Sequence, residues 1–245
     1  MAAFKDEIGV DLVRRLAVEL AAAWPAFPRQ RFQRGITAEL ERLELLARVD
    51  ALAGRLAGSL PQRFDDAATV LWAALASPSF TGWMTLPCGT FVAQRGLDHP
   101  AIALPLLAGL TPRWSSEGPI RPFIEHHPDL TYDHLRRWAT DQDEHVRRLV
   151  SEGTRPRLPW APLLRGLIAD PSPNLPLLEQ LVDDPSPYVR RGQRRRPVTL
   201  IATPAKWSHV KGRQFTNMRR SVHTRGRPNN RTTTRGSPPR RSGPA

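Results

Sequence analysis

The sequence has few of the residues on which several protein classes depend. Only one of its 245 residues is a cysteine, Cys88, which excludes a disulfide framework and a cysteine-rich zinc site and is typical of a reducing compartment. No apolar run approaches the roughly 18 residues needed to span a bilayer. The first residues, MAAFKDE, turn acidic where a signal peptide would turn apolar. The sequence therefore predicts a cytoplasmic protein that makes no membrane contact.

Acidic residues are missing from one part of the chain. Residues 192–245 contain 14 lysines and arginines and no aspartate or glutamate, whereas the whole chain has 36 basic and 23 acidic residues. The net charge of +13 therefore belongs to this segment, and residues 1–191 are close to neutral. A segment rich in arginine, proline, serine and threonine, without apolar periodicity, cannot bury enough surface to fold alone. We predict a folded domain over 1–191 and a disordered Arg/Pro-rich tail over 192–245.

Alternating patterns of the β-strand type are nearly absent, and the domain shows helical periodicity instead. Leu12, Leu16 and Leu20 recur every four residues, and a second leucine stripe runs through 45–60. Prolines punctuate these stripes where helices are expected to end. The fold class predicted is all-α. The stretch 80–97 contains glycines and prolines that allow either a loop or short helices.

An internal repeat indicates how the helices are arranged. Residues 141–148 read DQDEHVRR and residues 184–191 read DPSPYVRR, so Asp, Val, Arg and Arg recur with a period of 43 residues. The motif DPSP occurs at 170–173 and again at 184–187, and these two turns bracket a helix through 175–181. Such a period is typical of two-helix HEAT-like repeats. We predict a HEAT-like α-solenoid of antiparallel helix pairs with a concave surface; an irregular helical bundle is the alternative.

Two long and unusual strings carry a resemblance to a known family. Residues 114–123, WSSEGPIRPF, and residues 145–160, HVRRLVSEGTRPRLPW, strongly resemble the AlkC branch of bacterial DNA alkylation repair glycosylases. Residues 4–6 and 184–191 fit the same pattern, so the resemblance covers 1–191. It implies a HEAT-like solenoid that hydrolyses the N-glycosidic bond of alkylated bases such as 3-methyladenine in double-stranded DNA, without a metal or cofactor. We expect the protein to be a monomer.

The resemblance implies that Glu117, Glu152 and Trp160 lie at the lesion. A purine methylated at N3 is cationic and a good leaving group, so the enzyme mainly stabilises an oxocarbenium-like sugar and positions water. Carboxylates suit this chemistry, and a tryptophan face attracts a cationic base by roughly 0.5 to 2 kcal/mol. Contacts with DNA phosphates are expected from nearby arginines. These are Arg121, Arg147, Arg148, Arg155, Arg157, Arg190 and Arg191.

Each of these residues has a structural alternative. Glu152 can pair with a nearby arginine, and Glu117 can cap a helix that begins near Ile120. Trp160, between two prolines, can pack between helices. The arginines of the Val-Arg-Arg motifs are commonly solvated or paired in repeat proteins. The histidines show no metal-ligand spacing with acidic residues or cysteine, so no metal site is predicted.

The resemblance stops abruptly after Arg191. The family continues with a helix expected to bring a further acidic catalytic residue, whereas this chain reads GQRRRPVT and has no acidic residue beyond that point. Three interpretations of the tail stay open: a basic arm that raises DNA affinity, out-of-frame translation of a GC-rich gene, which we favour, and a targeting or ribonucleoprotein-like tail. A domain cut here is expected to leave the apolar face around Leu177, Leu178, Leu181 and Val182 uncovered. The alternative function is therefore a noncatalytic DNA-binding or scaffold protein with an incomplete active site.

Overall fold

The structure is a computed structural model that describes residues 4–194, and every regular element in this part of the chain is helical. The all-α prediction is confirmed. The predicted tail lies outside the described residues, except that residues 192–194 continue the last helix. In chain order the elements are η1 (Phe4–Glu7), α1 (Val10–Ala23), α2 (Arg29–Gln33), α3 (Ile36–Leu40), α4 (Leu45–Ala57), α5 (Phe64–Ala74), η2 (Gly82–Met84), α6 (Thr85–Arg95), α7 (Pro100–Leu110), η3 (Thr111–Arg113), α8 (Arg121–His126), α9 (Pro128–Trp138), α10 (Glu144–Gly153), α11 (Arg165–Ala169), η4 (Ser172–Asn174), α12 (Leu175–Leu181) and α13 (Pro187–Arg194).

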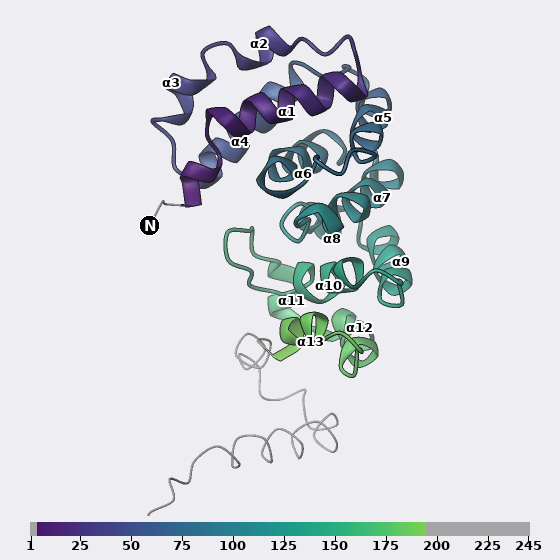
Figure 1. The fold of residues 1–245 in the computed structure, drawn as a ribbon. Coiled ribbons are helices and arrows are strands. Elements are labelled where there is room, and N and C mark those ends of the chain that lie inside the picture. Colours follow the sequence, from purple (N-terminus) through teal and green to yellow (C-terminus); the bar gives the residue numbers. More distant parts are fainter. Residues whose placement is uncertain (1–3, 195–245) are drawn as a thin grey trace, which may run out of the picture. The chain divides into compact units, whose positions relative to one another are not determined.

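The described helices follow one another in a stacked row (Figure 1). Helix α4 packs against α6, α5 against α7, and α10 against α13. The predicted stripe Leu12, Leu16 and Leu20 is buried in α1, and one continuous core runs from the N-terminal helices to α13. Each helix covers its apolar face only through its neighbours, which is the packing principle of a solenoid. None of the described helices combines the length and the apolar character needed to cross a bilayer.

The stretch 80–97 forms the short turn η2 and the helix α6. Cys88, Phe91 and Val92 of α6 are buried in the common core. A Cβ atom built on Gly89 would lie 2.9 Å from Cγ of Pro119, so a glycine is required for this close approach. The sequence of this stretch allowed either a loop or short helices, and its packing against the rest of the fold selects the helix.

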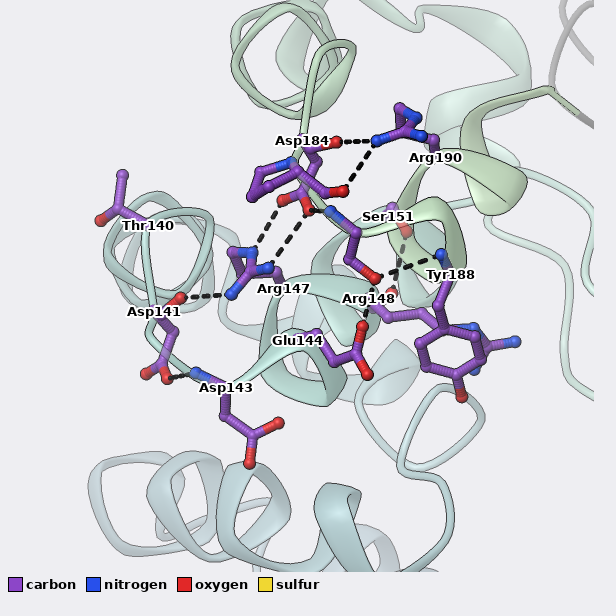
Figure 2. Close-up of polar contacts among 12 residues, drawn as sticks. Thr140, Asp141, Asp143, Glu144, Arg147, Arg148, Ser151, Asp184, Tyr188 and Arg190 are labelled. Carbon is purple, nitrogen blue, oxygen red and sulfur yellow. Dashed lines mark hydrogen bonds and ion pairs between the residues drawn. The ribbon is translucent and has the colours of Figure 1, made fainter.

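The first copy of the 43-residue repeat forms a closed turn at the start of α10 (Figure 2). Asp141 Oδ1 accepts a hydrogen bond from the backbone N–H of Asp143 at 2.8 Å. The Nη1 atom of Arg147 donates to the backbone oxygens of Asp141 at 2.8 Å and Gln142 at 3.0 Å. Arg147 thus links α10 to the turn that precedes it, which we call the entry turn of the helix.

The second copy repeats these bonds at the start of α13. Asp184 Oδ1 accepts from the backbone N–H of Ser186 at 2.8 Å, and Nη1 of Arg190 donates to the backbone oxygens of Asp184 and Pro185. The two copies are also joined, because Arg147 donates to the Asp184 carboxylate from Nε at 2.7 Å and from Nη2 at 3.2 Å. The sequence repeat is therefore a repeat of hydrogen bonds (Figure 2).

The last apolar face is largely covered. Leu177 and Leu181 are buried, because α12 packs against both α10 and α13. Leu178 and Val182 are half-buried. The expectation of an uncovered face is wrong for the two leucines at its centre, since the eight residues of α13 supply the cover.

Candidate active site

The two motif strings meet in the structure and bring their carboxylates together. Glu117 lies in the turn before α8 and Glu152 in the last turn of α10, and their exposed fractions are only 7% and 6%. A Cβ atom built on Gly153 would lie 3.7 Å from Cα of Glu117 and 2.9 Å from Cγ2 of Ile120. A glycine at this point therefore lets the end of α10 approach the turn that carries Glu117.

Each carboxylate is paired with an arginine. Nη1 of Arg148 donates to Oε1 of Glu117, and Nη1 of Arg155 donates to Oε2 of Glu152 at 2.8 Å. Glu117 does not cap α8: its carboxylate accepts from Arg148, and the backbone N–H groups of Ile120 and Arg121 donate to the backbone oxygens of Ser116 and Gly118. The pairing alternative holds for Glu152. Such pairs compensate the cost of burying charge, because a buried carboxylate without a partner is strongly destabilising.

The surroundings of Glu117 change its proton affinity. Burial raises the pKa of Glu117 above its ordinary value, the neighbouring Glu152 charge acts in the same direction, and the Arg148 charge opposes both. A buried carboxyl group with a raised pKa exchanges its proton closer to neutral pH, which suits acid–base chemistry.

Helix α13 closes one side of the site at Gly192, a residue that sequence reasoning missed. A Cβ atom built on Gly192 would lie 2.8 Å from Oε1 of Glu152 and 2.7 Å from Oγ of Ser151. Any side chain at this position would collide with the Glu152 carboxylate. The only signal in the sequence was the position of this glycine, directly after the second Val-Arg-Arg.

Tyr188 is the second residue that sequence reasoning missed. Cζ of Arg148 lies 4.5 Å from the centre of the Tyr188 ring, and Cζ of Arg191 lies 5.8 Å from it. The ring and the Glu117 carboxylate together fix the position of Arg148, beside which Tyr188 is seen in Figure 2. Arg148 thus connects the site to α13.

Trp160 is exposed and belongs to a group of aromatic side chains at the surface. It lies in the 154–164 loop between α10 and α11, its exposed fraction is 64%, and its φ of 61° is in a region that residues other than glycine rarely adopt. Its ring centre lies 6.0 Å from that of Phe4, which lies 6.0 Å from that of Trp83, and the Trp83 and Trp114 centres are 5.2 Å apart. We call Phe4, Trp83, Trp114 and Trp160 the aromatic surface. Trp160 therefore does not pack between helices.

The arginines proposed for phosphate contacts divide into groups. Arg157 and Arg191 are exposed, and neither has an ion pair within the described residues. Arg148 and Arg155 pair with the site carboxylates. The first two can meet a phosphate directly, whereas the second two can do so only by leaving a carboxylate.

The other three arginines serve the fold. Arg147 binds Asp184, and Arg190 binds the carbonyl groups of its own entry turn. Arg121 is only 1% exposed, and all of its hydrogen bonds go to backbone carbonyl groups. A phosphate contact does not fit Arg121, because its guanidinium group has no exposed side. Within residues 4–194, no three His, Cys, Asp or Glu side chains gather in a way that could hold a metal ion.

Comparison with known proteins gives two informative matches. No family model matches the sequence. Over 192 residues the chain is 34% identical to "Uncharacterized protein YhaZ" of Bacillus subtilis (strain 168), an alignment that spans 78% of this chain and 53% of the relative. The solved structure of the Pseudomonas fluorescens alkylpurine DNA glycosylase AlkC, bound to DNA containing an abasic site analog, matches with a TM-score of 0.81 and 30% identity. That match covers 90% of this chain and 62% of the AlkC chain. The chain therefore spans about half of the curated relative and less than two thirds of the AlkC structure.

Proposed function

We propose, from the AlkC-like fold of this chain, that it binds alkylated double-stranded DNA and hydrolyses the N-glycosidic bond of alkylated bases such as 3-methyladenine. The observation that carries the proposal is the buried carboxylate pair Glu117 and Glu152, which two separate motifs bring together. The similarity of the fold to AlkC supports the assignment to DNA repair.

The carboxylates act on the sugar and on the attacking water. An alkylated purine carries its own positive charge, so departure of the base needs no general acid and leaves an oxocarbenium-like sugar. Glu152 stabilises this cation, and Glu117, whose pKa is raised, takes the proton of the attacking water. Arg148 and Arg155 hold the carboxylates in the free protein. DNA phosphates compete for these arginines and thereby release the carboxylates toward the sugar.

The aromatic surface and the exposed arginines bind the DNA. Trp160 offers its face to the cationic base, an attraction of about 0.5 to 2 kcal/mol. Arg157 and Arg191 contact phosphates without reading sequence, so the affinity falls with rising salt.

Release of methylated bases from methylated duplex DNA by the full chain tests the proposal. We expect Glu152→Gln and Glu117→Gln to lower the rate at least about 100-fold, because a neutral amide neither stabilises a sugar cation nor accepts a proton. Glu179→Gln is the matched control, because Glu179 is exposed on α12 and remote from the carboxylate pair in the sequence. Equal rates for all three variants would contradict the proposal.

A second candidate function is DNA binding without catalysis. It is favoured by the arginine pairing of both carboxylates and by the absence of any acidic residue after Arg191, where the family is expected to supply another. Under this alternative the wild-type chain binds duplex DNA in a salt-sensitive manner and releases no base. The same assay therefore separates the two functions.

A further inference from the structure

Arg121 is the most completely buried large polar side chain of the described residues, and it lies at the start of α8. Its Nε atom donates to the backbone oxygen of Pro162 at 2.5 Å. Nη1 donates to the backbone oxygens of Gly153 at 3.0 Å and Arg155 at 2.7 Å, and Nη2 donates to that of Pro156 at 3.1 Å. One side chain thus binds both ends of the 154–164 loop.

The middle of the loop has few hydrogen bonds of its own, whereas its first residue is held by other groups: Asn174 Nδ2 donates to the backbone oxygen of Thr154 at 2.7 Å, and Thr154 Oγ1 donates to that of Val150 at 2.7 Å. Pro156, Pro159 and Pro162 have no N–H group, so the loop cannot form a regular backbone ladder of its own. Within the described residues, the loop N–H groups that donate to backbone oxygens are those of Thr154, Arg155, Ala161 and Leu164. Buried carbonyl groups without a donor cost free energy, and Arg121 supplies the donors that the prolines lack.

Arg121 also differs from an ordinary buried ion. No carboxylate accepts a hydrogen bond from it in residues 4–194, although Glu125 is near enough to favour its charge. Burying a guanidinium group is costly unless its donors are satisfied. The loop conformation that offers three carbonyl oxygens to Arg121, beside that of Gly153 at the end of α10, is therefore favoured over conformations that do not.

We propose that Arg121 is a positioning residue of the candidate site, which fixes the 154–164 loop so that Trp160 stays exposed on the aromatic surface and, in the free protein, Arg155 lies against Glu152. The inference rests on the proposed function for what the loop contacts, but not for how it is held. Lysine cannot take over this task, because a single ammonium group does not reach carbonyl oxygens on several sides as the planar fork of arginine does.

Arg48 provides a matched control. It is the other buried arginine that binds carbonyl groups, with bonds to the backbone oxygens of Leu43 at 2.9 Å, Lys5 at 2.7 Å and Ile8 at 3.1 Å. It holds η1 against α4 and, within the described residues, makes no hydrogen bond to the 154–164 loop, which meets η1 through the ring contact of Trp160 with Phe4. Arg48→Lys therefore removes an anchor of the same kind at a different place.

Limited trypsin digestion of the full chain tests how the loop is held, without DNA. The peptide bond between Arg157 and Leu158 is the trypsin site inside the loop, because proline follows Arg155. We expect Arg121→Lys to speed cleavage of this bond about tenfold and Arg48→Lys to change it far less, because only the first removes hydrogen bonds to the loop backbone. The fragment ending at Arg157 is followed by mass spectrometry at a temperature where thermal melts show both variants folded. Equal cleavage in the wild type and Arg121→Lys overturns the proposal, as does an equal rise in both variants.

A double-mutant cycle separates positioning from mere structural support. Duplex DNA affinity is measured for Arg121→Lys, Trp160→Ala and the double variant. We expect Arg121→Lys to weaken binding about tenfold in the wild-type background and not at all beside Trp160→Ala, because both remove the same contact. Additive losses show that the loop is structural only and overturn the positioning role. If no variant, including the wild type, binds DNA, the proposed function fails while the digestion still decides whether Arg121 holds the loop.

Discussion

The two copies of the repeat, residues 141–148 and 184–191, share the same local bonds but differ in what their first arginine does beyond them. Arg147 ties its own turn and also reaches the carboxylate of Asp184 in the next copy. Arg190 ties its own turn only, within the described residues. The local motif therefore builds the turn, and the presence of a following repeat decides whether the arginine becomes a bridge between repeats.

The second arginine of each copy shows the same difference nearer the candidate site. Arg148 binds the Glu117 carboxylate and lies 4.5 Å from the centre of the Tyr188 ring, whereas Arg191 lies 5.8 Å from the same ring centre and is exposed. Identical positions in a repeat thus provide one arginine committed to a buried carboxylate and one available for a phosphate. Substitutions at equivalent positions are the natural way to test this asymmetry.

The largest effect is expected for Asp184→Ala. This substitution leaves the Arg147 side chain, which is only 12% exposed, without its carboxylate and should lower the free energy of unfolding by about 3 to 4 kcal/mol. The equivalent change in the first copy, Asp141→Ala, removes one capping bond and should cost about 1 kcal/mol. Urea unfolding of both variants gives the comparison, and equal losses would show that the bridge between repeats contributes nothing.

The next effect concerns the arginines themselves. Arg147→Ala should cost about 2 to 3 kcal/mol, because it removes both the bond to Asp184 and the tie to the turn. Arg190→Ala removes only the hydrogen bonds to its own entry turn and should lower the free energy of unfolding by about 1 kcal/mol. The same unfolding measurement applies. A loss for Arg190→Ala as large as that for Arg147→Ala would mean that Arg190 has a bridging partner too.

The helical architecture could be predicted because the residues that cause it recur at regular spacings in the sequence. Leucines spaced for one helix face must find cover, and the recurrence of Asp and Arg after 43 residues marks the same turn twice. The structure of α6 could not be predicted in this way. Its fit depends on the contact between Gly89 and Pro119, which lie far apart in the sequence.

The meeting of the carboxylates at the site followed from the family resemblance, but the roles of its arginines did not. Whether a guanidinium group is free to meet a phosphate or is bound by carbonyl groups depends on which distant segment of the chain packs against it. Arg121 is buried because a loop more than thirty residues later folds over it. Trp160 is exposed in the same loop, which Arg121 binds at both ends.

The pH dependence of stability should have opposite signs for Asp184 and Glu117. Burial acts to raise the pKa of Asp184, but the hydrogen bonds from Arg147 and the Ser186 N–H outweigh it and hold this pKa below its ordinary value. Its stabilisation is therefore present above the pKa of the unfolded state and is lost as the pH falls through the lower folded value. Burial raises the pKa of Glu117, so its contribution is present below the unfolded value and is lost as the pH rises through the folded one.

Neutral variants should reveal these signs. Relative to the wild type, Asp184→Asn should lose less stability at acidic pH than at neutral pH, and Glu117→Gln should become relatively more stable as the pH rises above about 4. Urea unfolding across the acidic range measures both differences. Parallel pH curves for Glu117→Gln and the wild type would mean that burial of Glu117 does not alter its titration.

The smallest effect on stability is expected for Arg191→Ala, and it is the sharpest test of the difference between the second arginines. Arg191 is exposed and its cation–π contact with the Tyr188 ring is long, so the free energy of unfolding should change by less than about 0.5 kcal/mol. If Arg191 meets a phosphate, the slope of log affinity against log salt for duplex DNA should fall by about one unit. Arg148→Ala should instead lower stability, because it leaves the Glu117 carboxylate buried without its partner. If Arg191→Ala leaves this slope unchanged, Arg191 makes no phosphate contact, and the two second arginines do not differ in the way proposed.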